Sequence, residues 1–280
     1  MNKYSYDLDS IIRDSFKGTI KYLRDNGINN REPILRITNS SYLNENTLIY
    51  LAITTILSYN EISNILEYDI NYIPVSPLIW TAILFWTLWR FSISYGIYVP
   101  IMKTIYIIKD PLKRDIDRIL DNLSSRNISG PSIIRIKSSE HSVVIYPVYT
   151  DGNNIEDAVT KSMIDIVMNH ETTHSIVGIS ELKASALEYI LYFYKNKLYT
   201  YPKIYEIIEE NVKRCKKYVE ETKKYDPYDL GKCYANIIIN ENKQSPNINI
   251  KNIIRKIKHL SKKDVINIIK NYNINQNLKI

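Results

Sequence analysis

The order of secondary-structure patterns within residues 132–177 most constrains what this chain can fold into. Two short runs, SIIRIKS (132–138) and SVVIYPVY (142–149), are rich in β-branched and aromatic residues, and the short polar turn between them predicts a hairpin or two strands of one sheet. A turn at Asp151-Gly152 follows, and residues 154–177 then have the apolar periodicity of a helix. We therefore expect a small β-sheet directly before one long helix.

Helical periodicity dominates the rest of the chain. Further helices are expected at residues 9–26, 46–66, 110–122, 181–197, 203–224, 228–240, 249–259 and 262–272, and a short strand at 33–38. The predicted fold class is therefore α+β, mostly α. Four regions are expected: a mostly helical N-terminal region (1–76), an apolar segment (77–109), a central domain (110–240) and basic C-terminal helices (241–280).

The most apolar region is PLIWTAILFWTLWRFSISYGIYVPIM (77–102). Its length suits a transmembrane helix of about 20 residues, but Arg90 opposes a simple span because a charge in the middle of a bilayer is costly. The alternative is a buried core helix, or two helices broken near Gly96 and Pro100, and the sequence leaves both open. The polar N-terminus predicts no signal peptide, so we expect an intracellular protein; if residues 77–102 span a membrane, the following domain is cytoplasmic.

Charge and cysteine content exclude few classes of protein. The formal net charge of +7 permits contact with anionic partners but does not require it. Basic residues between 251 and 270 alternate with isoleucines, which is more typical of an amphipathic helix with a solvated face, so nucleic acid is not an expected partner. The only two cysteines, Cys215 and Cys233, argue against a disulfide framework and against a cysteine-based zinc cluster.

The 154–177 helix carries the motif HETTH (170–174). Residues four apart on an α-helix differ by about 40° and about 6 Å of rise, so His170 and His174 converge on one point beside the helix. Neutral histidine nitrogens bind zinc, and Glu171, about 100° round the helix, can reach a water molecule there without being a ligand. HExxH on a helix is a metalloprotease pattern. The alternative is a solvated helix face, but two of only four histidines fall in this window.

A catalytic zinc site needs a third protein ligand, and Glu181 and Glu188 are the candidates. On one continuous helix Glu181 would lie about 10 Å beyond His174, too far to share an ion. Gly178 offers a break, after which Glu181 would begin the next helix and face back towards the histidines. We therefore expect Glu181 to be the ligand and Glu188, two turns further on, to be a supporting or solvated residue.

The sequence resembles zinc metallopeptidases of the gluzincin type, in which a glutamate ligand on the next helix follows HExxH. ELKA (181–184) is similar to the E-x-x-A that often carries this ligand, although gluzincins usually have a longer connection after the second histidine. The order of apolar segment, helix, strands and motif helix is similar to that of HtpX-like membrane zinc proteases. The resemblance covers roughly residues 110–240, and it implies a zincin-like core in that region followed by a helical C-terminal part.

This resemblance also implies two roles outside the motif. In zincins a strand before the motif helix binds extended substrate, and SVVIYPVYT (142–150) would be that edge strand. DPYDLGKCYANIII (226–239) is similar to the P-Y-x-x-G stretch of aminopeptidase gluzincins, in which the tyrosine hydroxyl stabilises the tetrahedral intermediate. Tyr228 would then be the oxyanion donor.

These features together predict a zinc-dependent metallopeptidase that hydrolyses a peptide or protein substrate. Zn²⁺ held by His170, His174 and Glu181 would activate water, and Glu171 would be the general base. The alternative is a non-enzymatic, membrane-associated or scaffold protein with a degenerate HExxH.

Overall fold

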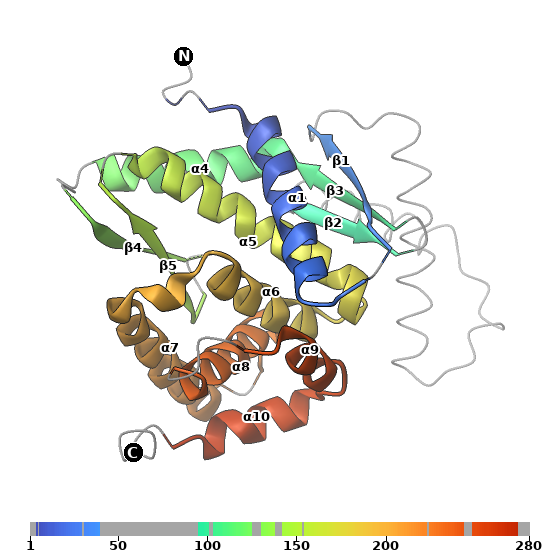
Figure 1. Cartoon of the computed structure of the whole chain (residues 1–280). Coiled ribbons are helices and arrows are strands. Elements are labelled where there is room, and N and C mark those ends of the chain that lie inside the picture. Colours follow the sequence, from blue (N-terminus) through green and yellow to red (C-terminus); the bar gives the residue numbers. More distant parts are fainter. Residues whose placement is uncertain are drawn as a thin grey trace, which may run out of the picture.

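The structure is a computed structural model, and it describes residues 4, 6–29, 31–39, 95–100, 103–124, 130–137, 142–152, 154–222, 224–243 and 248–273. In these residues helices dominate and two small sheets lie apart from each other (Figure 1). This confirms the predicted α+β, mostly α fold class.

The helices begin and end close to the predicted positions. They are α1 (Leu8–Asp25), α4 (Lys109–Ser124), α5 (Ile155–Val177), α6 (Glu181–Lys195), the short 3₁₀ helix η2 (Leu198–Thr200), α7 (Pro202–Glu221), α8 (Pro227–Glu241), α9 (Ile250–Lys258) and α10 (Lys262–Asn271). Each of these α-helices agrees with its prediction to within one turn. The predicted helix at 46–66 lies outside the described residues.

The strands form one mixed sheet and one hairpin. They are β1 (Ile34–Thr38), β2 (Gly96–Val99), β3 (Thr104–Ile108), β4 (Ser132–Lys137) and β5 (Ile145–Thr150). In the mixed sheet, of order β1-β3-β2, the central β3 is parallel to β1 and antiparallel to β2. β4 and β5 form the antiparallel hairpin expected before the motif helix.

The mixed sheet corrects the sequence analysis, which expected only one sheet and placed residues 95–108 in an apolar segment. The error has a simple cause. Every residue of β3 is buried, and a strand buried on both faces has a continuous apolar sequence that periodicity cannot distinguish from a buried helix. Residues 77–94 lie outside the described residues. In the part of the chain that the structure describes, no helix is long and apolar enough to cross a membrane.

The long helix α5 lies at the centre of the fold (Figure 1). Helices α1, α4 and α6 and both sheets contact it, and the buried side chains from α1 to Tyr272 form one continuous cluster. The closest helix pair is α6 with α8. Gly231 permits this approach, because a Cβ atom at that position would lie 2.2 Å from the carbonyl oxygen of Leu182. This close packing brings the N-terminal half of α8 towards α5.

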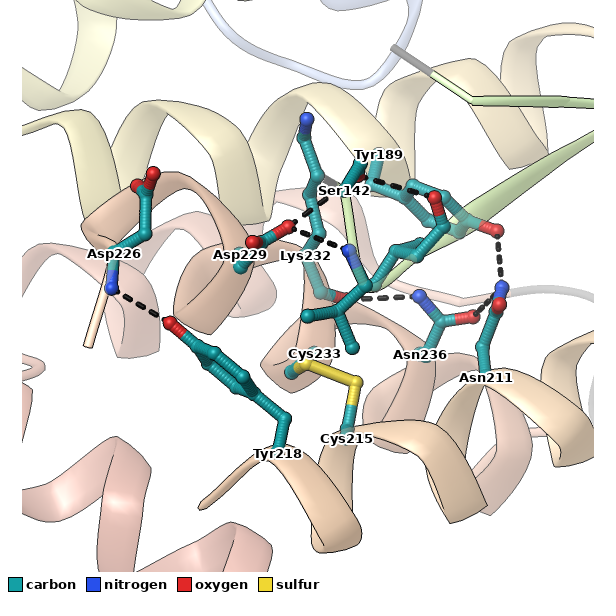
Figure 2. The surroundings of a disulfide bond; sticks show 12 residues. Ser142, Tyr189, Asn211, Cys215, Tyr218, Asp226, Asp229, Lys232, Cys233 and Asn236 are labelled. Atoms are coloured by element: carbon teal, nitrogen blue, oxygen red, sulfur yellow. Dashed lines mark hydrogen bonds between the residues drawn. A yellow bond between two sulfur atoms is a disulfide. The ribbon is translucent and has the colours of Figure 1, made fainter. Parts of the chain in front are cut away.

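A disulfide joins α7 to α8, although two cysteines are too few for a disulfide framework. Cys215 and Cys233 are bonded, with their Cα atoms 5.5 Å apart (Figure 2). Cys215 lies six residues before the end of α7, and Cys233 lies six residues after the start of α8. Because the short connection at residues 222–226 folds the two helices into a hairpin, the cysteines lie level with each other. The exclusion of a disulfide framework stands, and the single bond between the only two cysteines was not predicted.

Candidate metal centre

The two histidines of the motif meet as their spacing predicts. His170 and His174 project from the last two turns of α5, and their Nε2 atoms are 3.2 Å apart. The helix is almost wholly buried here, and His174 is only 7% exposed. A solvated helix face, the alternative considered for this motif, therefore does not describe these residues.

A sharp turn returns Glu181 to the histidine pair. Gly178 ends α5 with a φ of 80°, a left-handed conformation that glycine adopts without steric cost, and α6 begins at Glu181. Glu181 Oε2 then lies 3.1 Å from His170 Nε2 and 3.4 Å from His174 Nε2. The structure thus places Glu181, and not Glu188, beside both Nε2 atoms.

These three donor atoms have the spacing of a zinc coordination sphere. Two ligands of a tetrahedral ion are separated by about 1.63 times the metal–ligand bond, which for zinc bonds of about 2.0–2.1 Å is about 3.3–3.4 Å. The observed separations of 3.1, 3.2 and 3.4 Å are close to this value. Within the described ranges His170, His174 and Glu181 form the one group suited to hold a metal. The three donor atoms are therefore spaced as three ligands of one tetrahedral ion would be.

The Nδ1 atoms of both histidines already have hydrogen-bond partners. His170 Nδ1 lies 3.2 Å from Glu188 Oε2, and His174 Nδ1 lies 2.9 Å from the carbonyl oxygen of Gly178. Both partners are acceptors, so when each ring is neutral its proton can sit on Nδ1, and Nε2 then presents a lone pair to a metal. Contacts of this kind orient histidine ligands in metal sites. Glu188 is therefore buried against His170, and of the two expectations for it, supporting or solvated, the second does not describe it.

The carboxylates alter the proton affinity of this cluster. Burial alone lowers the pKa of His170, but hydrogen bonds to Glu181 and Glu188 raise it to about 10. Burial raises the pKa of Glu181, and hydrogen bonds to His170 and His174 outweigh it and hold that pKa well below its usual range. In the metal-free protein a proton on His170 thus supplies positive charge where the donor atoms converge.

No protein-family model, no curated protein and no solved structure matches this chain.

Glu171 lies against strand β2. Its side chain is 6% exposed, and a Cβ atom on Gly96 would lie 2.6 Å from its Cγ. The backbone N–H of Tyr98 donates a hydrogen bond to its carboxylate. Burial raises the pKa of Glu171, and the nearby histidines oppose this rise only in part. The backbone of β2 thus holds Glu171 beside the donor triangle, the three donor atoms of His170, His174 and Glu181. Burial in this position increases the affinity of the Glu171 carboxylate for a proton.

A pocket of about 310 Å³ extends beside His170. One wall is apolar and comes from the preceding turns of α5, and the other is polar and comes from α8. Its lining includes Gly96, Met163, Ile166, Val167, His170, Glu171, Tyr228, Asp229 and Lys232.

Tyr228, the predicted oxyanion donor, does lie at this site. Its ring stacks on that of His170, with ring centroids 5.5 Å apart and 22° between the planes. One turn of α8 is anchored beside it, since Asp229 accepts hydrogen bonds from the Val143 N–H at 3.2 Å and from the Ser142 hydroxyl at 3.3 Å. Figure 2 labels Asp229 and Ser142. The structure therefore brings all five predicted site residues together.

Strand β5, predicted to bind substrate, has its outward edge occupied. The N–H and C=O of Ile145 both bond to the Asn211 side chain, at 2.9 and 2.8 Å. The C=O of Pro147 accepts the Tyr192 hydroxyl at 2.8 Å. The other edge of the strand pairs with β4. At Ile145 and Pro147, strand β5 therefore has no unpaired backbone groups that could bind an extended substrate.

Sequence reasoning missed three residues of the site. Gly96 was considered only as a helix breaker, Tyr98 was placed in the apolar segment, and Tyr146 in the strand predicted to bind substrate. Among 24 tyrosines, neither tyrosine carries a local signal. Gly96 alone carries such a signal, because a glycine within an apolar run often marks a place where another group approaches the backbone closely.

Proposed function

We propose that this protein is a zinc-dependent peptidase of the gluzincin kind, with a zincin-like core. The observation that carries the proposal is the triangle of His170, His174 and Glu181 donor atoms at tetrahedral spacing, with a buried glutamate next to it. The residues suit zinc because two imidazoles and one carboxylate are a known catalytic ligand set that leaves one position open.

Glu171 is the general base in this proposal. A zinc ion held by the three donors would supply Lewis acidity and lower the pKa of a water molecule towards about 7. Glu171 would be placed to accept a proton from a water molecule bound there and to pass it to the leaving amine. Its buried position and raised pKa suit a carboxylate that must hold a proton between the two steps.

Strand β2 is the element that we expect to bind the peptide. The N–H of Ile108 bonds to the C=O of Tyr95, so by the antiparallel alternation the backbone groups of Gly96 and Tyr98 point away from β3. In the described part of the chain no strand pairs with this outer edge. Because the Tyr98 N–H on this edge already donates to Glu171, an extended peptide could pair there through the Gly96 backbone groups and the Tyr98 C=O. In this proposal β2, and not residues 142–150, is the strand that binds extended substrate.

Tyr228 is the proposed donor to the oxyanion. Its ring position against His170 places it next to the donor triangle, on the polar wall of the pocket. A hydroxyl there can stabilise the negative charge that develops on the carbonyl oxygen of the peptide bond being hydrolysed.

Metal content is the first test. The chain is purified without a histidine tag, and elemental analysis is run on wild type and His170→Ala. We expect about one zinc per wild-type chain and none in the variant. If neither protein holds metal after zinc is supplied at neutral pH, the motif has no role in metal binding and the proposal is wrong.

The second test separates chemistry from metal binding. Glu171→Gln should retain zinc but lower the hydrolysis of fluorescently labelled casein by about 10²–10⁴-fold, the usual contribution of a general base. Glu206→Gln, at an exposed position on α7, is the matched control and should leave hydrolysis unchanged. Undiminished turnover in Glu171→Gln would exclude this mechanism.

A further inference from the structure

Tyr146 is a fully buried tyrosine whose hydroxyl points into a charged cluster. It lies on β5, and its hydroxyl donates a hydrogen bond to Glu188 Oε1. Its ring is held by Tyr189, at 4.8 Å between centroids, and by the edge of Tyr192, at 5.5 Å. The Lys232 Nζ atom lies 5.4 Å from the ring centroid. The side chain therefore has one orientation, set by packing on several sides.

Glu188 connects this hydroxyl to the proposed metal site. The residue is only 2% exposed, and its two carboxylate oxygens have different partners. Oε1 accepts the Tyr146 hydroxyl, and Oε2 lies 3.2 Å from His170 Nδ1. A buried carboxylate with one oxygen left unsatisfied is costly, so removing the hydroxyl favours a rotation that also disturbs the second contact.

We propose that Tyr146 is a positioning residue for the metal: it fixes the Glu188 carboxylate, which in turn orients His170. This inference rests on the proposed function, because it requires a metal bound at His170 Nε2. The Nδ1–H of His170 donates to Glu188, which keeps the lone pair on Nε2 and fixes the plane of the ring. Tyr146 thereby acts on the metal through two intervening side chains.

A purely structural role is the competing explanation, and the same core provides its control. Tyr192 is also buried, and its hydroxyl donates to the backbone C=O of Pro147 at 2.8 Å. Its partners are this backbone group and the Ser162 side chain, and not a carboxylate that contacts a metal ligand. Tyr192→Phe therefore removes a buried hydroxyl of the same kind without breaking the connection to His170.

The test is zinc affinity, measured by competition with a chelator of known affinity. Tyr146→Phe should weaken zinc binding by about 10–100-fold, the usual effect of losing an outer-sphere partner. Tyr192→Phe should bind zinc as tightly as wild type. The cobalt-substituted protein provides a second readout, because the visible bands of Co²⁺ depend on ligand geometry and should change in Tyr146→Phe alone.

A double-mutant cycle tests the route through Glu188. Glu188→Gln should weaken zinc binding by itself, and adding Tyr146→Phe to it should cause little further loss. If the two losses add in full, or if Tyr146→Phe binds zinc like wild type, the positioning role is wrong. Wild-type protein that binds no zinc would overturn the proposed function as well. Zinc binding without peptide hydrolysis would overturn only the peptidase.

Discussion

Replacing Gly96 with alanine should damage the general base while leaving the metal ligands in place. A Cβ atom on Gly96 would lie 2.6 Å from Glu171 Cγ, whereas ordinary contact begins at 3.4 Å, so the side chain must move by about 0.8 Å. The closest contact is with Cγ, and Cδ and Oε1 follow at 3.0 Å, so the whole carboxylate must move. Misplacing a catalytic group by about 1 Å can cost about 10²-fold in rate. We therefore expect Gly96→Ala to lower kcat/KM for labelled casein by about 10²-fold.

The assay combines turnover with zinc affinity. Zinc affinity should stay within about twofold of wild type, because the three atoms nearest to the added methyl all belong to Glu171, which is not a proposed ligand. Gly18→Ala is the control, since a Cβ atom on this exposed α1 residue meets nothing within 4 Å. It should leave kcat/KM unchanged and stabilise α1 by up to about 1 kcal/mol. If Gly96→Ala keeps wild-type kcat/KM, β2 does not position the base and the reasoning is refuted.

Two further predictions concern protons and the disulfide. Zinc binding at pH 7 should release about one proton, because the pKa of about 10 keeps His170 protonated in the metal-free protein while the metal needs its neutral form. Higher pH favours the neutral form, so apparent zinc affinity should rise about tenfold per pH unit between pH 7 and 9; calorimetry in buffers of different ionisation enthalpy measures the release, and pH-independent binding would contradict it. The double substitution Cys215→Ala and Cys233→Ala should lower the free energy of unfolding by about 3 kcal/mol, the chain-entropy value for a separation of 18 residues. Urea denaturation measures this loss, and an unchanged midpoint would show that the bond contributes nothing.

The helices were predictable because their signals are local. Asn154 caps α5 and Asp226 caps α8, each by accepting a backbone N–H in the first turn, and Gly178 ends α5. Such residues act within a few positions of the helix end that they define. The match between predicted and observed helices therefore needed no knowledge of the fold.

The strands were harder because pairing is a long-range property. Residues 34–38 and 104–108 pair in parallel, although about 70 residues separate them in the sequence. No sequence feature near Gly96 indicates that this residue belongs to the outer strand of this sheet, next to Glu171. The predicted edge strand, β5, was the nearest one in sequence, and side chains from α6 and α7 occupy its outer edge.

The sequence by itself determined the convergence of His170 with His174 and the return of Glu181. The first follows from the period of the α-helix, and the second from a glycine that ends one helix before another begins. Tertiary structure alone decided the rest of the site: the contact of Gly96 with Glu171, the Cys215–Cys233 bond and the connection from Tyr146 to His170. These contacts join residues between 18 and 75 positions apart, and only the packing of helices and strands around one core brings such residues together.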